Sequence, residues 1–240
     1  NTENYKDLKY VPLDKPVNKL YSVAASFKPN MILNHFGFCD ETEVVFYDYS
    51  KPSLAFKKLL VTQWDGEDYP AFITWALSKY NFSETGGTET EIYTRDELWK
   101  REIQWWGSEK AIKDHWDRYK NLKHSFIHVD ICENPERVTN KITSEDNSVI
   151  WWSNAFHTVN AQYVRGLQGV KDCYNTWVDQ INNKNPNISS EVFSRLKTLS
   201  TLRFNYYPNQ NKPVEISKQD GVALGCETHV DSGIFTVLYQ

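Results

Sequence analysis

Two side chains near the end of the chain have the types and the spacing of metal ligands. His229 and Asp231 lie two positions apart, directly before the apolar run 234–240. In an extended strand, residues i and i+2 project from the same face, so an imidazole and a carboxylate here can bind one ion. This ligand pair suits Fe(II) and leaves coordination positions open for other molecules. The sequence therefore predicts a metal site at His229 and Asp231.

A second sequence block lies about twenty residues upstream of this pair. Residues 202–208 read LRFNYYP, and residues 228–233 read THVDSG before the chain continues as IFTVLYQ. Together, in this order, the two blocks resemble the isopenicillin-N-synthase-like branch of the 2-oxoglutarate- and Fe(II)-dependent oxygenases. The resemblance covers about 40 residues and implies a double-stranded β-helix, which is a jelly-roll variant.

The resemblance also implies roles for individual residues. His229 and Asp231 would bind Fe(II), and Asn205 and Tyr207 would contact the co-substrate 2-oxoglutarate. Enzymes of this family use O₂ to oxidise a small-molecule substrate while 2-oxoglutarate becomes succinate. The family also has a distal histidine and a basic residue, which would follow Gln240. We therefore expect a further C-terminal segment, or a partner chain, to complete the jelly roll.

The longer first part of the chain alternates strand-like and helix-like segments. Alternation of this kind predicts a mostly parallel sheet covered by helices on both faces. We therefore expect an α/β Rossmann-like domain over residues 1–185 and an incomplete jelly-roll segment over residues 186–240, joined by the polar stretch 182–187. The predicted strands are 19–26, 44–48, 124–131 and 148–152, and the predicted helices are 29–37, 52–64, 69–80, 94–106, 108–122, 134–142 and 158–182.

Three polar side chains, Asp48, Asp130 and Asn154, are expected at the carboxyl ends of predicted strands. Ligands bind at these ends in open parallel sheets. Asp48 follows Ser26 by 22 residues, near the spacing at which an acidic residue binds a ribose hydroxyl. The pattern resembles S-adenosylmethionine-dependent methyltransferase domains in outline, although residues 23–28 (VAASFK) contain no Gly-x-Gly. The alternative is a Rossmann-like scaffold in which Asp48 is an ordinary acidic residue flanking a helix.

The spacing of the C-terminal pair occurs a second time, at His128 and Asp130. His157 and Arg165 follow and are candidates for a distal ligand and a carboxylate-binding base. However, a helical pattern begins at Asn134 where a strand would be needed. The sequence therefore favours a parallel strand that ends at Asp130 over a second metal site.

The composition argues against several classes of function. The formal net charge is -4, which gives no reason to expect a nucleic-acid partner. No apolar run reaches the roughly 20 residues that a membrane span needs. The four cysteines show no CxxC pairing, so we expect reduced thiols and a cytoplasmic protein.

Two kinds of residue, tryptophan and lysine, occur as adjacent pairs whose positions in the fold can be predicted. The tryptophan pairs 105–106 and 151–152 could line a ligand groove, but the strand position of the second pair favours the core. The lysines at 57 and 58 are expected on a solvated helix face.

Three hypotheses about function follow from these residues. The first is a non-haem Fe(II)- and 2-oxoglutarate-dependent oxygenase with an incomplete catalytic core. The second is a methyltransferase-like or nucleotide-binding domain with an inactive oxygenase remnant. The third is a non-catalytic interaction module, because about 55 residues of half a jelly roll bury little core by themselves.

Overall fold

The computed structural model describes residues 16–80, 94–143, 147–153, 155–156, 159–185 and 189–190, together with Tyr5 and Leu8. All of them belong to the first compact unit of the chain, Asn1–Thr198. The predicted jelly-roll segment falls outside the described residues, apart from the pair 189–190. Among the residues that are described, no helix is both long enough and apolar enough to cross a membrane.

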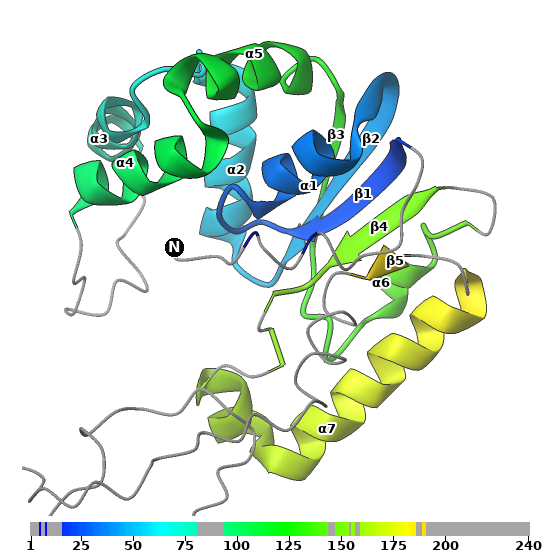
Figure 1. The fold of residues 1–240 in the computed structure, drawn as a ribbon. Coiled ribbons are helices and arrows are strands. Elements are labelled where there is room, and N and C mark those ends of the chain that lie inside the picture. The colour runs from blue at the N-terminus through cyan, green and yellow to red at the C-terminus, as the bar shows by residue number, and fades with distance from the viewer. Residues whose placement is uncertain are drawn as a thin grey trace, which may run out of the picture. The chain divides into compact units, whose positions relative to one another are not determined.

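A parallel sheet forms the centre of this unit and confirms the predicted α/β class. The strands lie in the order β3-β2-β1-β4-β5, and every neighbouring pair is parallel (Figure 1). β1 is therefore central, and β5 contributes only two residues. The strands are β1 (Val17–Val23), β2 (Phe38–Asp48), β3 (Lys123–His128), β4 (Ser148–Trp151) and β5 (Ser189–Ser190).

The helices cover both faces of the sheet because β2 and β3 are added on one side of β1, and β4 and β5 on the other. Right-handed crossovers from β1 to β2 and from β2 to β3 place their helices on one face. The step from β3 back to β4 places the next helices on the other face, as Figure 1 shows for α6 and α7. The helices are α1 (Lys28–Phe36), α2 (Lys51–Gln63), α3 (Tyr69–Lys79), α4 (Arg95–Trp106), α5 (Glu109–Tyr119), α6 (Glu136–Thr139) and α7 (Val159–Lys184).

Alternation along β2 connects the two layers of helices to one core. Successive strand residues face opposite sides of a sheet. Phe46 stacks on His124 and has the Lys57 ammonium of α2 over its ring, whereas Tyr47 contacts Trp177 of α7. Both β2 residues are at most 1 % exposed. A strand buried on both faces explains why residues 44–47 (VVFY) read as a continuous apolar run.

Local signals in the sequence predicted several helix ends correctly. α1 has Pro29 in its first turn and ends at Gly37, whose φ of 81° is easily adopted by glycine. α4 begins with the predicted capping box, in which the side chains of Thr94 and Glu97 each bind the other's backbone N–H. The bounds of several elements differ from prediction. For example, β2 begins at Phe38 rather than at residue 44, and β3 ends at His128 rather than near residue 131. α7 also contains a non-helical kink at Gly166.

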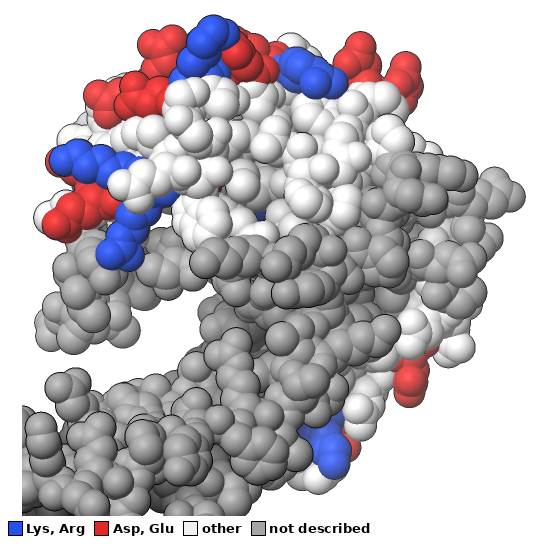
Figure 2. Space-filling model, in the orientation of Figure 1, with Lys and Arg blue, Asp and Glu red and all other residues white. Residues whose placement is uncertain are grey.

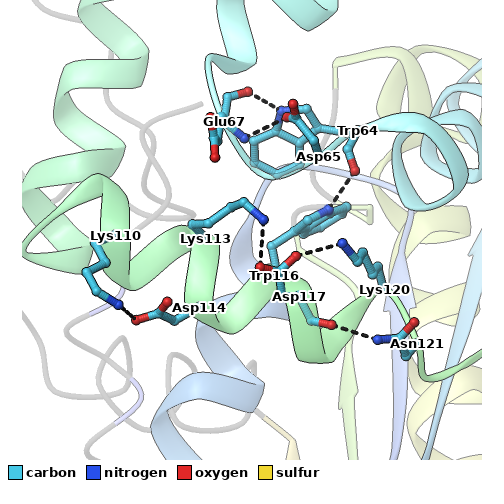
Figure 3. Close-up of polar contacts among 10 residues, drawn as sticks. All are labelled: Trp64, Asp65, Glu67, Lys110, Lys113, Asp114, Trp116, Asp117, Lys120 and Asn121. Carbon is cyan, nitrogen blue, oxygen red and sulfur yellow. Dashed lines mark hydrogen bonds and ion pairs between the residues drawn. The ribbon is translucent and has the colours of Figure 1, made fainter.

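The turn between α2 and α3 docks on α5 through Trp116 (Figure 3). The indole Nε1 of Trp116 donates to the backbone oxygen of Trp64 at 2.9 Å. The turn passes so close that a Cβ on Gly66 would lie 2.9 Å from Trp116 Cδ1, and Gly66 also has a φ of +93°. Glycine is therefore required at position 66 by its backbone conformation and by the available space.

The outer surface of α5 carries charges of both signs. Asp117 binds the ammonium groups of Lys113 and Lys120 at 2.6 Å each, and Lys110 pairs with Asp114 (Figure 3). Figure 2 shows acidic and basic side chains next to one another over the top of the molecule. Because water and salt screen these exposed pairs, they add little to stability.

Candidate functional site

The carboxyl edge of the sheet is the candidate site, because the strand order reverses there. β1 has β2 on one side and β4 on the other, and the chain leaves these strands toward opposite faces. Ligands of open α/β sheets bind in the crevice at this reversal. The segments at this edge are the β1–α1 loop (residues 24–27), the residues after β2 (49–50), the turn after β3 (129–133) and the residues after β4 (152–153).

Unusual backbone conformations occur on both sides of the reversal. Ser26 after β1 has a φ of 40°, and Ser153 after β4 has a φ of 50°. Asp68 is the third non-glycine residue with positive φ in the described part of the chain. A left-handed conformation costs a non-glycine residue roughly 1–2 kcal/mol, so surrounding contacts must stabilise it.

Contacts from two elements hold Ser26 in this conformation. Its hydroxyl Oγ accepts a hydrogen bond from the backbone N–H of Lys28 at 3.1 Å, at the start of α1. Its backbone oxygen accepts one from the Lys57 Nζ of α2 at 2.8 Å. Protein contacts thus hold a loop that has no glycine.

Asp48 lies at this edge, as predicted, and connects the end of β2 to the end of β1. Its Oδ1 accepts a hydrogen bond from the backbone N–H of Ser50 at 2.9 Å, and the N–H groups of Ala24 and Tyr49 also stabilise the carboxylate. Partial burial nevertheless raises the pKa of Asp48, with the hydrogen bonds and the charge of His128 acting in the opposite direction. Asp48 is thus a half-buried acceptor at the predicted position.

The prediction that Lys57 and Lys58 both lie on a solvated helix face is wrong for Lys57. Its side chain is buried, with 6 % exposed, whereas Lys58 is exposed. Burial lowers the pKa of Lys57 to about 8, although the negative charge of Asp48 raises it. A signal was present in the sequence: Lys57 lies three residues from Leu54 and three from Leu60, the other buried residues of α2. This spacing places all three on one helix face.

Asp130 lies in the turn after β3, where both of its carboxylate oxygens have protein partners. Oδ1 accepts the Cys132 backbone N–H at 2.8 Å, and Oδ2 binds the Arg165 guanidinium at 2.8 Å. Arg165 also contacts Glu133 at 3.1 Å. Asp130 therefore connects this turn to α7 through its ion pair with Arg165.

His128 and Asp130, which form the second His-x-Asp sequence, bind different partners. His128 Nε2 lies 2.9 Å from the backbone oxygen of Tyr49, so this nitrogen is the donor. The described residues contain no group of three histidine, cysteine, aspartate or glutamate side chains that could hold a metal ion. His128 thus connects the ends of β2 and β3.

Other candidate residues have the following positions. Trp151 and Trp152 are buried, which confirms the core interpretation for this pair. Trp106 is also buried, and Trp105 is 43 % exposed. Among the described residues, Cys39, Cys132 and Cys173 form no disulfide, and Cys226 lies outside the described part of the chain. The remaining predicted residues, Asn154, His157, Asn205, Tyr207, His229 and Asp231, lie outside the described residues.

The first turn of α1 is poorly suited to bind phosphate. Helix N-termini bind anions through unpaired backbone N–H groups. Here the Lys28 N–H is bonded to Ser26 Oγ, and Pro29 has no N–H to offer. The edge therefore offers an acceptor for a hydroxyl group in Asp48, without the cradle of N–H groups that a pyrophosphate needs.

Comparison with known proteins assigns no family to the chain. No family model matches it, and no curated protein or solved structure matches it either. The strand order β3-β2-β1-β4-β5 is that of the first five strands of doubly wound nucleotide-binding sheets. Because one fold supports many functions, the function must be argued from the site.

Proposed function

We propose that this protein is an Fe(II)- and 2-oxoglutarate-dependent oxygenase whose α/β domain has a Rossmann-like arrangement and a site of its own for a nucleoside-type ligand. The sequence of residues 201–240 supports the oxygenase activity. Its two blocks, LRFNYYP and THVDSG, occur in the order and at the separation typical of that family.

The proposed oxygenase roles follow from the chemistry of the side chains. His229 and Asp231 would supply one nitrogen and one oxygen ligand, while Asn205 and Tyr207 would orient 2-oxoglutarate. Fe(II), once bound, supplies the capacity to activate O₂. In that family, one further ligand and a basic residue that binds the 2-oxoglutarate carboxylate complete the site.

Anaerobic titration of the full-length protein with Fe(II) and 2-oxoglutarate tests this activity. We expect a weak visible charge-transfer band that His229→Ala and Asp231→Ala both abolish. His35→Ala, which changes an exposed histidine of α1, should leave the band intact. If the wild-type protein gives no band, the oxygenase proposal is wrong.

The left-handed serines at the strand reversal support the second site. Strained residues cluster at ligand sites, where surrounding structure holds them in place. Ser26 and Ser153 follow the two strands between which the strand order reverses. In a Rossmann-like arrangement, the loops after these two strands enclose the ligand.

The chemistry of this edge favours a nucleoside over a dinucleotide. Asp48 can accept hydrogen bonds from ribose hydroxyls, and the neighbouring Tyr49 is 68 % exposed and offers a ring on which a base can stack. Since Ser26 Oγ and Pro29 remove two N–H groups from the first turn of α1, a pyrophosphate gains little there. Adenosine and S-adenosylmethionine are ligands of this class.

Calorimetry with S-adenosylmethionine, adenosine and NAD tests the second site. We expect the first two to bind more tightly than NAD, and Asp48→Asn to weaken both by at least tenfold, or about 1.4 kcal/mol. Asp40→Asn is the matched control, because Asp40 is an exposed residue at the other end of β2. Absence of binding heat for both nucleosides, or equal affinity in Asp48→Asn, would contradict the site.

A further inference from the structure

The side chain of Lys57 extends from α2 to the β1–α1 loop, at the edge where the strand order reverses. It is buried, and its Nζ donates to the backbone oxygen of Ser26, 31 residues away in the chain, at 2.8 Å. The same ammonium lies 5.4 Å from the centre of the Phe46 ring. Desolvating an ammonium is costly unless it finds a partner, and Ser26 provides that partner.

The β1–α1 loop needs such a contact because it contains no glycine. Ser26 has a φ of 40° without the freedom that glycine would give, and its hydroxyl accepts one hydrogen bond, from the backbone N–H of Lys28. The backbone oxygen of Ser26 accepts a hydrogen bond from Lys57, while Asp48 accepts one from the backbone N–H of Ala24. The loop is therefore held at both of its ends.

We infer that Lys57 is the positioning residue of the proposed nucleoside site, because it holds Ser26 in the left-handed conformation that gives the β1–α1 loop its shape. This inference rests on the proposed second site. It assigns no contact with the ligand to Lys57. The loop shape would be one that other doubly wound sheets obtain from glycines.

A purely structural role for Lys57 makes a different prediction. Lys57 shares the buried face of α2 with Leu54 and Leu60, so loss of its side chain could simply loosen the core. Replacing Ser26 by glycine separates the two roles. Glycine adopts a φ of 40° without a partner, but it cannot refill volume lost from α2.

The test compares Lys57→Met with Lys58→Met, which changes the exposed neighbour. Amide hydrogen exchange over residues 24–28 should be at least tenfold faster in Lys57→Met, and S-adenosylmethionine affinity at least tenfold weaker. Lys58→Met should match the wild type in both measurements. Adding Ser26→Gly to Lys57→Met should restore most of both losses, whereas Ser26→Ala, which removes only the hydroxyl, should not.

Each outcome decides between the two roles. Unchanged loop exchange in Lys57→Met, or no rescue by Ser26→Gly, overturns the inference. If Lys57→Met does not fold, the double variant with Ser26→Gly should fold, and a double variant that stays unfolded also overturns it. If the wild type binds no nucleoside, the proposed site fails, while the exchange measurements still show whether Lys57 holds the loop.

Discussion

Replacing Trp116 with alanine is expected to lower the free energy of unfolding by about 4 kcal/mol. Trp116 is 1 % exposed, and its ring centroid lies 4.5 Å from that of Trp64 and 5.2 Å from that of Tyr119. Truncation removes this packing and leaves the Trp64 backbone oxygen without its indole donor. It also removes the surface on which the turn at Gly66 rests.

Urea denaturation of Trp116→Ala, Trp116→Phe and Trp105→Ala measures this effect. Phenylalanine keeps most of the packing and loses the hydrogen bond, so we expect a loss of roughly 1–2 kcal/mol. Trp105 is 43 % exposed, and its truncation should cost less than about 1 kcal/mol. A loss for Trp116→Ala as small as that for Trp105→Ala would show that the α2–α3 turn does not depend on Trp116.

Acidification is expected to destabilise the protein strongly between pH 6.5 and pH 4, because two histidines, the buried His115 and the half-buried His124, must stay neutral. Burial lowers the pKa of both His115 and His124 from 6.5 to about 4, and the charges of Arg118 and Lys57 add to the effect. His115 Nε2 accepts from the Asn30 amide at 3.4 Å. His124 donates through Nδ1 to a backbone oxygen, and its buried Nε2 has no hydrogen-bond partner among the residues that the structure describes. Protonation would add a buried charge at both places.

The sign of the pH dependence follows from which state binds protons first. The unfolded chain takes up protons near pH 6.5, while the folded histidines resist until about pH 4. The contribution of these histidines to the free energy of unfolding is therefore present above pH 6.5. It is lost as the pH falls toward 4, by about 3 kcal/mol for each histidine. Burial raises the pKa of Asp48 and of Glu102, which acts in the opposite direction and offsets part of the loss.

Urea denaturation at a series of pH values checks this prediction. His124→Phe keeps an aromatic ring and removes a titrating group, so its stability should fall by about 3 kcal/mol less over the same pH range. His35→Gln changes an exposed histidine and should retain the wild-type slope. Equal slopes for the wild type and His124→Phe would show that His124 is not the group that resists protonation.

Features of the fold that depend on neighbouring residues could be predicted from the sequence. Pro29 and Gly37 bound α1 because each acts through its own backbone, and Thr94 and Glu97 start α4 through one local exchange of hydrogen bonds. The kink at Gly166 could not be predicted, since a glycine in a helical pattern only lowers helix propensity. Where such a helix bends depends on contacts such as that of Arg165 with Asp130.

The candidate site was predictable only in part, for the same reason. Asp48 was located because the end of a strand can be read from an apolar run. The left-handed serine could not be foreseen, because Ser26 has no intrinsic preference for that conformation and is held by a lysine 31 residues away. Lys57 itself was misassigned, because pairing it with Lys58 obscured its alignment with Leu54 and Leu60.

The contact between Trp64 and Trp116 also gives an optical signal with which unfolding can be followed. Two indoles with centroids 4.5 Å apart and planes inclined at 57° are close enough for their electronic transitions to couple. Circular dichroism should therefore contain exciton signals in addition to the helical signal. Trp64 and Trp99, and Trp152 and Trp177, also lie about 6 Å apart, so the spectrum of the wild type minus that of Trp116→Phe gives the part that belongs to Trp64 and Trp116. Loss of this part before loss of the helical signal would show that the α2–α3 turn detaches from α5 before the rest of the domain unfolds.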